Sequence, residues 1–582
     1  MQRFNNIKNF WLKKSHELLY WKKRPRIAFI KKNIFFRWFV DGRLNVFQNC
    51  ISLSDEKNKF KENSNKTAII TFSKDAVIKK YSYKDIHELV SILTAFLKKI
   101  KNKNTKVLIH SSASIESAIS MLACANLGMH FCVLFKELEL EAINSRVKIF
   151  KPDVILSNGS HKIFKKVRSD KKLKIFNLKN ILNEKNKKKI KKYYRIDHYK
   201  ADNDLFTLFT SGSTGDPKGI THAAAGYLLY AKYTCIEQFG MNQNSVVLTA
   251  SDAGWINGHS YALFGPLSLG ATTILLEKPM SLLNKTVLEK VLQEKITIFY
   301  LPVTLIRLMR EIYKNRIFKK HSIVTLGSMG EPLAKSVGIW FAKTFNLKNK
   351  AIINTYYQTE TSAIICSPKY SDNIKTSPHG SVGRPVSNII KIKALDQKKK
   401  EIRIITPWPG CMKKVINGIY YYKKYWDENY NFRMFDFATK KNSYIEVHGR
   451  TDDVINIRGH RIGSEEIESI LMKNKIIIEA CAVATPDHLE GFSLVLFLVT
   501  TNFTQIDQEV NNSINANFGS FALPKKIIYL SALPKTRSGK ILRRLLRDIL
   551  LKPQQNNFGD LSTIVNPKII NEIKNKIIKL TN

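Results

Sequence analysis

One short stretch concentrates the residue types that bind phosphate groups. It reads TSGSTGDPKGI from Thr210 to Ile220 and holds three glycines, four hydroxyl side chains and one lysine. A Walker-type phosphate loop has the pattern G-x-x-x-x-G-K-[ST], and counting from Gly212 the sixth position is Pro217, so the pattern fails. The remaining backbone N–H groups and hydroxyls still suit a polyphosphate. The residues expected to provide them, with one cation, are Thr210, Ser211, Gly212, Ser213, Thr214, Gly215 and Lys218.

A polar surface turn would have a similar composition. The segments around the loop are therefore needed to distinguish a ligand-binding loop from such a turn. The loop follows DLFTLFT, which is typical of a strand. Further on, ATTILLE, ITIFYLP and SIVTLGSMGEP also indicate strands, separated by the helical segments LLNKTVLEKVLQEK and VTLIRLMREIY. In the second helix we expect Leu305, Leu308, Met309 and Ile312 on one face. Strands joined by helices pair in parallel, and such sheets bind ligands at the carboxyl ends of their strands.

The pattern changes after about residue 450. GSEEIESILMKN predicts a short helix, and ACAVATP, LVLFLVTT and KKIIYLSALP predict short strands. We therefore expect an α/β protein with a large N-terminal domain of several subdomains and parallel-rich sheets, followed by a smaller mobile α+β domain. Asp452 marks the boundary between residues 1–451 and 452–582.

Charge and cysteines restrict the partners and the compartment. The net charge of +48 comes mostly from lysines spread along all 582 residues. We interpret it as a tolerant, lysine-rich surface and expect no nucleic acid partner. The seven cysteines are scattered without a C-x-x-C pair, which favours a reducing compartment and a cytoplasmic protein. The longest apolar run, residues 118–135, is interrupted by polar residues, so we expect no membrane span.

Six ordered motifs together resemble those of acyl-adenylate-forming enzymes, and most closely the acetyl-CoA synthetase type. They are LFTLFTSGSTGDPKGITHAAAGYLLYA, GWINGHSYALFGPLSLGATT, GSMGEP, YYQTET, GRTDDVINIRGHRIGSEEIES and LPKTRSGKILRR. The resemblance extends from residue 38 to residue 567. It implies an ATP-dependent ligase for a short carboxylate, similar to acetate or propionate, and CoA. The carboxylate would attack the α-phosphate of ATP, and the CoA thiol would then displace AMP.

The resemblance also implies the main site residues. Lys540 would bridge the carboxylate and the α-phosphate as the catalytic lysine, and it is a candidate for acetylation, which would remove its charge. Glu360 would bind the Mg²⁺ that accompanies ATP. The other ATP-binding positions implied are Gly330, Glu331, Pro332, Asn354, Thr355, Tyr356, Tyr357, Gln358, Thr359, Asp436, Arg450 and Arg461.

The second half-reaction requires a different face of the small domain, for which Asp452 matches the hinge of the family. Arg458, Gly459 and Lys162 would then lie near CoA. This half departs from the family pattern, because FKELE (135–139) replaces a glycine pair and Asn515 stands where an arginine is usual.

The acyl pocket implied by the resemblance consists of Ile256, Asn257, Met329 and Tyr357. Asn257 stands where threonine is usual and Tyr357 where tryptophan is usual. The acid is therefore expected to be short, and larger or more polar than acetate. Acetate, propionate, acrylate and a hydroxy acid all remain open, because one methylene changes binding by only about 1–3 kcal/mol.

Two other functional classes remain open at this point. One is an adenylate-forming enzyme whose acceptor is a carrier-protein thiol or another thiol or amine. The other is a non-catalytic relative that binds nucleotides or polyanions. Retention of Lys540, Glu360 and the complete loop favours the enzyme.

Overall fold

The structure is a computed structural model in which the chain divides into two compact units. The large unit comprises Met1–Ile392 and Ile404–Phe432, and the small unit comprises Lys393–Arg403 and Arg433–Asn582. The small unit thus includes strands that precede Asp452, and a domain boundary at that residue stays a prediction. The residues described are 4–51, 64–73, 76–102, 104–136, 138, 140–159, 163–169, 172–183, 196–210, 217–393, 400–441, 444–450, 454–457, 460–487, 491–518, 520–536, 539–555, 557–558, 561 and 564–581.

The first large sheet carries the predicted phosphate loop. Its strand order is β22-β12-β11-β7-β6-β8-β9. The strands are β6 (Lys106–His110), β7 (His130–Leu134), β8 (Val154–Ser157), β9 (Lys174–Asn177), β11 (Asp204–Thr210), β12 (Lys218–Ala223) and β22 (Lys414–Val415). The pairs from β11 to β9 are parallel, whereas β12 pairs antiparallel with β11 and with β22. Apolar residues of one face form a cluster with those of α6 (Leu140–Phe150).

The second large sheet contains the alternation predicted from residue 271 onward. Its order is β17-β16-β15-β13-β14-β4-β5. The strands are β4 (Thr67–Phe72), β5 (Ile78–Ser82), β13 (Val246–Thr249), β14 (Thr272–Leu276), β15 (Ile298–Pro302), β16 (Thr325–Met329) and β17 (Ile353–Asn354). Every pair is parallel except β4 with β5. The α/β class with parallel-rich sheets is confirmed.

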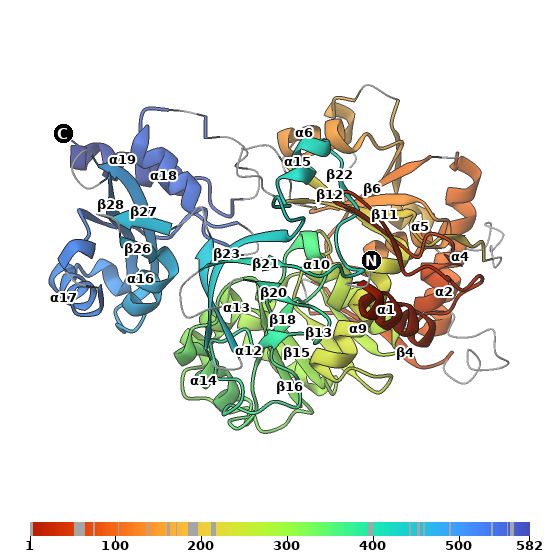
Figure 1. Ribbon diagram of the computed structural model, residues 1–582, viewed down its shortest axis with the longest axis horizontal. Helices are drawn as coiled ribbons and strands as arrows, with labels where there is room; N and C mark the ends of the chain where they lie inside the picture. The colour runs from red at the N-terminus through yellow and green to blue at the C-terminus, as the bar shows by residue number, and fades with distance from the viewer. Residues whose placement is uncertain are drawn as a thin grey trace. The chain divides into compact units, whose positions relative to one another are not determined.

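Helices α12 (Lys285–Gln293), α13 (Val303–Tyr313) and α14 (Lys335–Thr344) pack against this sheet in one hydrophobic cluster (Figure 1). The predicted face of α13 was partly wrong. Leu305 and Met309 are buried as expected, whereas Ile312 is 54% exposed. The buried stripe continues through Ile306, Met309 and Tyr313, at helical spacings of three and four, rather than through Ile312. The Tyr313 hydroxyl also donates a 3.0 Å hydrogen bond to the Leu282 carbonyl, which fixes this face inward.

Shorter elements complete the large unit. The helices are α1 (Asn5–Leu18), α2 (Val46–Cys50), α4 (Tyr83–Ile100), α5 (Ile115–Asn126), α7 (Leu178–Ile181), α9 (Ala224–Phe239), α10 (Ile256–His259), α11 (Gly265–Ser268) and α15 (Ile419–Lys423). The strand pairs are β1 (Phe29–Lys32) with β2 (Phe35–Trp38), β3 (Arg43–Leu44) with β10 (Tyr199–Lys200), and β18 (Cys366–Ser367) with β19 (Arg384–Pro385).

The small unit is α+β, as predicted, and its central strands are buried on both faces. Its elements include β21 (Lys400–Ile404), β23 (Phe432–Lys441), β24 (Tyr444–Arg450), β25 (Val454–Ile457), β26 (His460–Gly463), α16 (Ser464–Leu471), β27 (Ile477–Asp487), β28 (Gly491–Thr500), α17 (Asp507–Phe518), β29 (Lys526–Tyr529), α18 (Arg543–Leu551) and α19 (Ile569–Thr581). Alternate residues of β28 point to opposite faces. Leu494, Leu496 and Leu498 join a cluster with α16 and α17. Val495 and Phe497 join one with α18 and α19.

Two further observations concern the cysteines and the helices. All seven cysteines are free thiols, and only Cys411 is not fully buried. Among the helices that the structure describes, none combines the length and the apolarity that a membrane crossing requires.

Candidate functional site

The predicted phosphate loop connects two adjacent antiparallel strands of the first sheet. Thr210 ends β11, Lys218 begins β12, and the two residues are partners in the ladder. Asn417 fixes the backbone where β12 begins. Its Oδ1 accepts a 2.8 Å hydrogen bond from the Gly219 N–H, and its Nδ2 donates a 3.0 Å bond to the Pro217 carbonyl. The predicted residues between the strands lie outside the described part of the chain, namely Ser211, Gly212, Ser213, Thr214 and Gly215.

Lys218, the predicted cation of the loop, lies against aromatic rings. The residue is 8% exposed, and its ammonium nitrogen is 5.9 Å from the ring centroids of both Tyr421 and Tyr425. An ammonium at that distance is attracted to the negative face of an aromatic ring. The sequence-based reasoning missed these tyrosines, although the aromatic cluster IYYYKKYW from Ile419 was a visible signal.

Glu360, the predicted Mg²⁺ ligand, is a buried carboxylate at 7% exposure. Its Oε1 accepts a 2.6 Å hydrogen bond from the Tyr425 hydroxyl. Mg²⁺ prefers oxygen donors and commonly uses one or two carboxylates together with substrate phosphates and water. Glu360 fits that pattern as a single protein ligand. Among the residues described, no group of three or more potential metal ligands occurs.

His222 links the strand after the phosphate loop to the segment that carries Glu360. Its Nε2 donates a 2.7 Å hydrogen bond to the Thr359 carbonyl. Burial lowers the pKa of His222 to about 4, against a smaller opposing effect of this hydrogen bond. The imidazole is therefore neutral at physiological pH.

The predicted GEP motif follows directly after β16. Gly330 has a φ of +90°, and a Cβ built there would meet no described atom within 4 Å. The left-handed backbone favours glycine, and the open side leaves room for a ligand to approach. Glu331 forms an ion pair with Arg307 and accepts a 3.3 Å hydrogen bond from the Thr304 hydroxyl. Pro332 is exposed.

Asn354 and Thr355 are fixed by the neighbouring strand at the carboxyl end of the second sheet. Asn354 Oδ1 accepts a 3.0 Å hydrogen bond from Ser328 Oγ, and Nδ2 donates one of 3.0 Å to the Ser381 carbonyl. Thr355 donates from both its hydroxyl and its backbone N–H to the Ser328 carbonyl. Neighbouring strand ends therefore hold the two residues that precede the YYQTET segment.

The YYQTET segment itself, residues 356–361, forms a turn that is closed on itself. The Tyr356 N–H donates to the Cys366 carbonyl at 2.9 Å, and the Ile365 N–H donates back to the Tyr356 carbonyl at 3.0 Å. Gln358 donates from its backbone to Thr361 Oγ1 at 3.1 Å. The side chains of Tyr357 and Thr359 thus project from a backbone with little freedom.

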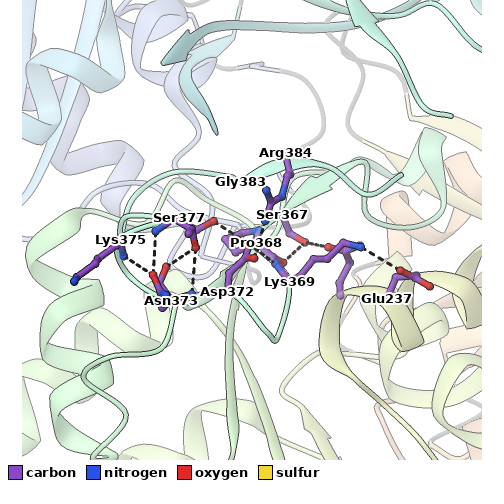
Figure 2. A network of polar contacts seen from close by, with 12 residues as sticks. Glu237, Ser367, Pro368, Lys369, Asp372, Asn373, Lys375, Ser377, Gly383 and Arg384 are labelled. Atoms are coloured by element: carbon purple, nitrogen blue, oxygen red, sulfur yellow. Dashed lines mark hydrogen bonds and ion pairs between the residues drawn. The ribbon is translucent and has the colours of Figure 1, made fainter. Parts of the chain in front are cut away.

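A network of polar contacts holds the loop between β18 and β19 (Figure 2). Asp372 accepts hydrogen bonds from the Lys369 N–H at 3.0 Å, from Ser377 Oγ at 3.0 Å and from Arg384 at 2.7 Å. Lys369 also forms a 3.2 Å ion pair with Glu237 of α9. The loop between β18 and β19 is therefore tied to a helix of the core.

The structure brings three of the four predicted acyl-pocket residues into direct contact. The Tyr357 hydroxyl donates to Asn257 Oδ1 at 2.5 Å, and Asn257 Nδ2 lies 2.6 Å from Met329 Sδ. The fourth residue, Ile256, is buried at the start of α10, next to Asn257. Tyr300 of β15 joins this group, because its hydroxyl lies 3.2 Å from that of Tyr357. Sequence reasoning missed Tyr300, whose only signal was a polar tip within the apolar strand ITIFYLP.

The predicted ribose-binding residues are neighbours in the small unit. Asp436 of β23 and Arg450 of β24 are partners in one antiparallel ladder, and Asp436 is 7% exposed. Arg461 lies in β26, opposite Asn456 of β25. The predicted hinge and CoA positions fall outside the described residues, namely Asp452, Arg458, Gly459 and Lys162.

Lys540 is exposed, but the backbone that carries it is fixed. The Thr536 N–H donates to the Lys540 carbonyl at 2.8 Å, and the Lys540 N–H donates to Thr536 Oγ1 at 3.1 Å. Just beyond it, Arg543 of α18 forms a 2.7 Å ion pair with Glu468 of α16. The backbone around Lys540 is thus held in place while the residue itself is exposed.

Three family models match this chain. The model described as AMP-binding enzyme matches residues 57–407, and the model described as AMP-binding enzyme C-terminal domain matches residues 466–540. The chain belongs to the AMP-binding enzyme family. A third model, acetyl-coenzyme A synthetase N-terminus, matches residues 2–50 of this family member.

Similar proteins agree with this assignment over almost the whole chain. An acetyl-coenzyme A synthetase of Dictyostelium discoideum is 32% identical, covering 98% of this chain and 92% of the relative. One of Helicobacter acinonychis (strain Sheeba) is 31% identical, covering 98% and 93%. Among solved structures, the acetoacetyl-CoA synthetase from Streptomyces lividans has a TM-score of 0.83 at 14% identity, covering 99% of this chain and 93% of that one. The anthranilate CoA ligase AuaEII in complex with anthranoyl-AMP has a TM-score of 0.74 at 17% identity, covering 87% and 97%.

These matches confirm the predicted relation of this AMP-binding enzyme to acetyl-CoA synthetases. The assignment makes the chain an AMP-forming acid–thiol ligase, with ATP and CoA as substrates and Mg²⁺ as the accompanying ion. The two solved structures support the fold alone.

Proposed function

We propose that the protein converts a short carboxylic acid to its CoA thioester in two steps, through the residues assembled above. A carboxylate oxygen attacks the α-phosphorus of ATP, the bond to pyrophosphate breaks, and an acyl-adenylate forms. The CoA sulfur then attacks the acyl carbon, AMP leaves with its phosphate oxygen, and the thiol proton passes to solvent.

One observation carries this proposal: a single braced turn carries both Tyr357 of the predicted acyl pocket and the buried carboxylate of Glu360. Tyr357 contacts Asn257, and three residues later Glu360 presents a buried carboxylate held by Tyr425. Such a turn would hold the acid and the nucleotide in a fixed mutual orientation, which accelerates a reaction between two bound molecules. Mg²⁺ bound at Glu360 would neutralise phosphate charge during the attack.

Lys540 is proposed to stabilise the negative charge that develops where the carboxylate meets the α-phosphate. Thr210 to Gly215 and Lys218 are proposed to bind the β- and γ-phosphates, and Asp436 and Arg450 the ribose hydroxyls. Acetylation of Lys540 would remove its charge and stop the first step, and its exposed side chain is accessible to a modifying enzyme.

Seven free thiols support a cytoplasmic location.

The test separates the two half-reactions. Carboxylate-dependent ATP–pyrophosphate exchange measures the first step, and CoA-dependent release of AMP measures the second. The proposal expects both activities with at least one short acid. Exchange without CoA-dependent AMP release would indicate another acceptor, and nucleotide binding without exchange would indicate a non-catalytic relative.

A further inference from the structure

Tyr357 and Asn257 of the predicted acyl pocket belong to a chain of polar contacts that continues to residues of the sheet. Tyr357 Oη contacts Asn257 Oδ1 at 2.5 Å and Tyr300 Oη at 3.2 Å. Tyr300 Oη contacts Thr355 Oγ1 at 2.6 Å, and Thr355 Oγ1 contacts the Ser328 carbonyl at 2.9 Å. These four contacts must share the protons of three hydroxyl groups, because the Asn257 and Ser328 oxygens can only accept.

Counting the protons leaves one contact without a donor. Thr355 must donate to Ser328, and Tyr357 must donate to Asn257 Oδ1. Tyr300 then has a single proton, and the short contact to Thr355 takes it. The 3.2 Å contact between the Tyr300 and Tyr357 oxygens therefore has no proton to share. Its length, beyond the usual range for O–H···O bonds, agrees with this.

The same group also contains a donor with a poor partner. Asn257 Nδ2 faces the Met329 thioether at 2.6 Å, and a thioether sulfur is only a weak acceptor. The predicted pocket thus presents one amide donor and one pair of phenol oxygens with no proton between them, each phenol donating its own proton elsewhere. Burial raises the pKa of both Tyr300 and Tyr357 well above the ordinary tyrosine value, so both phenols stay neutral.

We propose that this pocket selects a short carboxylic acid that carries a hydroxyl group, which accepts from Asn257 Nδ2 and donates to the Tyr357 and Tyr300 oxygens. The inference rests on the proposed function and specifies its substrate class. A hydroxyl group is suited because it is both donor and acceptor. A methyl group is neither, a keto oxygen only accepts, and an ammonium group only donates.

The experiment compares matched acids in the ATP–pyrophosphate exchange of the full-length protein. Glycolate is paired with acetate, and lactate and 3-hydroxypropionate are paired with propionate. For at least one pair we expect kcat/KM to favour the hydroxy acid by about tenfold or more, because a site built to bind a hydroxyl group rejects the analogue that lacks it. The ratio within one preparation does not depend on how much of the protein is folded.

Two variants and one control complete the test. Tyr357→Phe and Asn257→Leu should each bring the ratio close to one or below it. Tyr261→Phe is the matched control. Tyr261 is buried, and its ring centroid lies 5.7 Å from that of Tyr357. Its hydroxyl, however, is hydrogen-bonded to Thr234 Oγ1 and to the Ile364 N–H, outside the chain of contacts described above. This control should keep the ratio of the unchanged protein.

The outcomes distinguish this inference from the proposed function. Exchange that favours acetate or propionate over every hydroxy acid would overturn the inference and leave the ligase function standing. A hydroxy-acid preference that Tyr357→Phe and Asn257→Leu leave intact would also overturn it, because the discriminating groups would lie elsewhere. Absence of exchange with every acid would overturn both proposals.

Discussion

The two units hold their predicted functional residues in opposite ways. In the large unit, Glu360 is buried and bonded to Tyr425, and Tyr357 is bonded to Asn257. In the small unit, the side chain of Lys540 is exposed, although its backbone is fixed through Thr536. Buried, paired groups provide selectivity, because an unsatisfied polar group in a buried pocket costs about 1–3 kcal/mol. An exposed ammonium provides charge without selecting the acid.

The strongest test of this contrast removes the exposed charge. Lys540→Ala should reduce carboxylate-dependent exchange about a thousandfold, or ~4 kcal/mol, as for loss of a group that stabilises developing charge. The variant should still consume supplied acyl-adenylate when CoA is added. Lys568→Ala, which changes another exposed lysine of the same unit, should keep normal exchange. Full exchange in Lys540→Ala would remove this lysine from the mechanism.

The second test lowers the pH to destabilise the large unit through its buried residue His222. His222 has a folded-state pKa of about 4, below its ordinary value of 6.5. Between these values the unfolded chain binds more protons than the folded one. The contribution of neutral His222 to the free energy of unfolding is therefore fully present above pH 6.5 and decreases as the pH drops toward 4. At about pH 5 the loss from this residue is about 2 kcal/mol.

His222→Gln should reduce that loss, because glutamine does not titrate and can still donate to the Thr359 carbonyl. The measurement is the free energy of unfolding in urea for both proteins at neutral pH and at about pH 5. If both proteins lost the same free energy on acidification, His222 would not be the group responsible.

The smallest effect concerns the partner of Glu360. Tyr425→Phe should raise the Mg²⁺ concentration for half-maximal exchange about tenfold, because groups that orient a metal ligand typically have effects of this size. The matched control is Tyr420→Phe on α15, since Tyr420 is 65% exposed. An equal Mg²⁺ requirement in both variants would argue against Glu360 as the ligand.

Much of the fold was predictable because local patterns encode it. The alternation after residue 271 predicted β14, α12, β15, α13 and β16 in the correct order. The error at Ile312 has a tertiary cause: the helix face that packs inward includes Tyr313, whose hydroxyl reaches the Leu282 carbonyl. Periodicity gives the existence of an apolar stripe, but the neighbouring elements decide its centre.

By itself, the sequence determined the α/β class, the order of the motifs and the membership of the AMP-binding family. These properties follow from residue types and their spacing, which can be read directly from the amino-acid sequence. Only the tertiary structure placed Tyr300 beside Tyr357 and Tyr425 beside Glu360, across separations of 57 and 65 residues. Hydrogen bonds between distant segments depend on strand register and turn geometry, and no local pattern specifies which hydroxyl groups will meet.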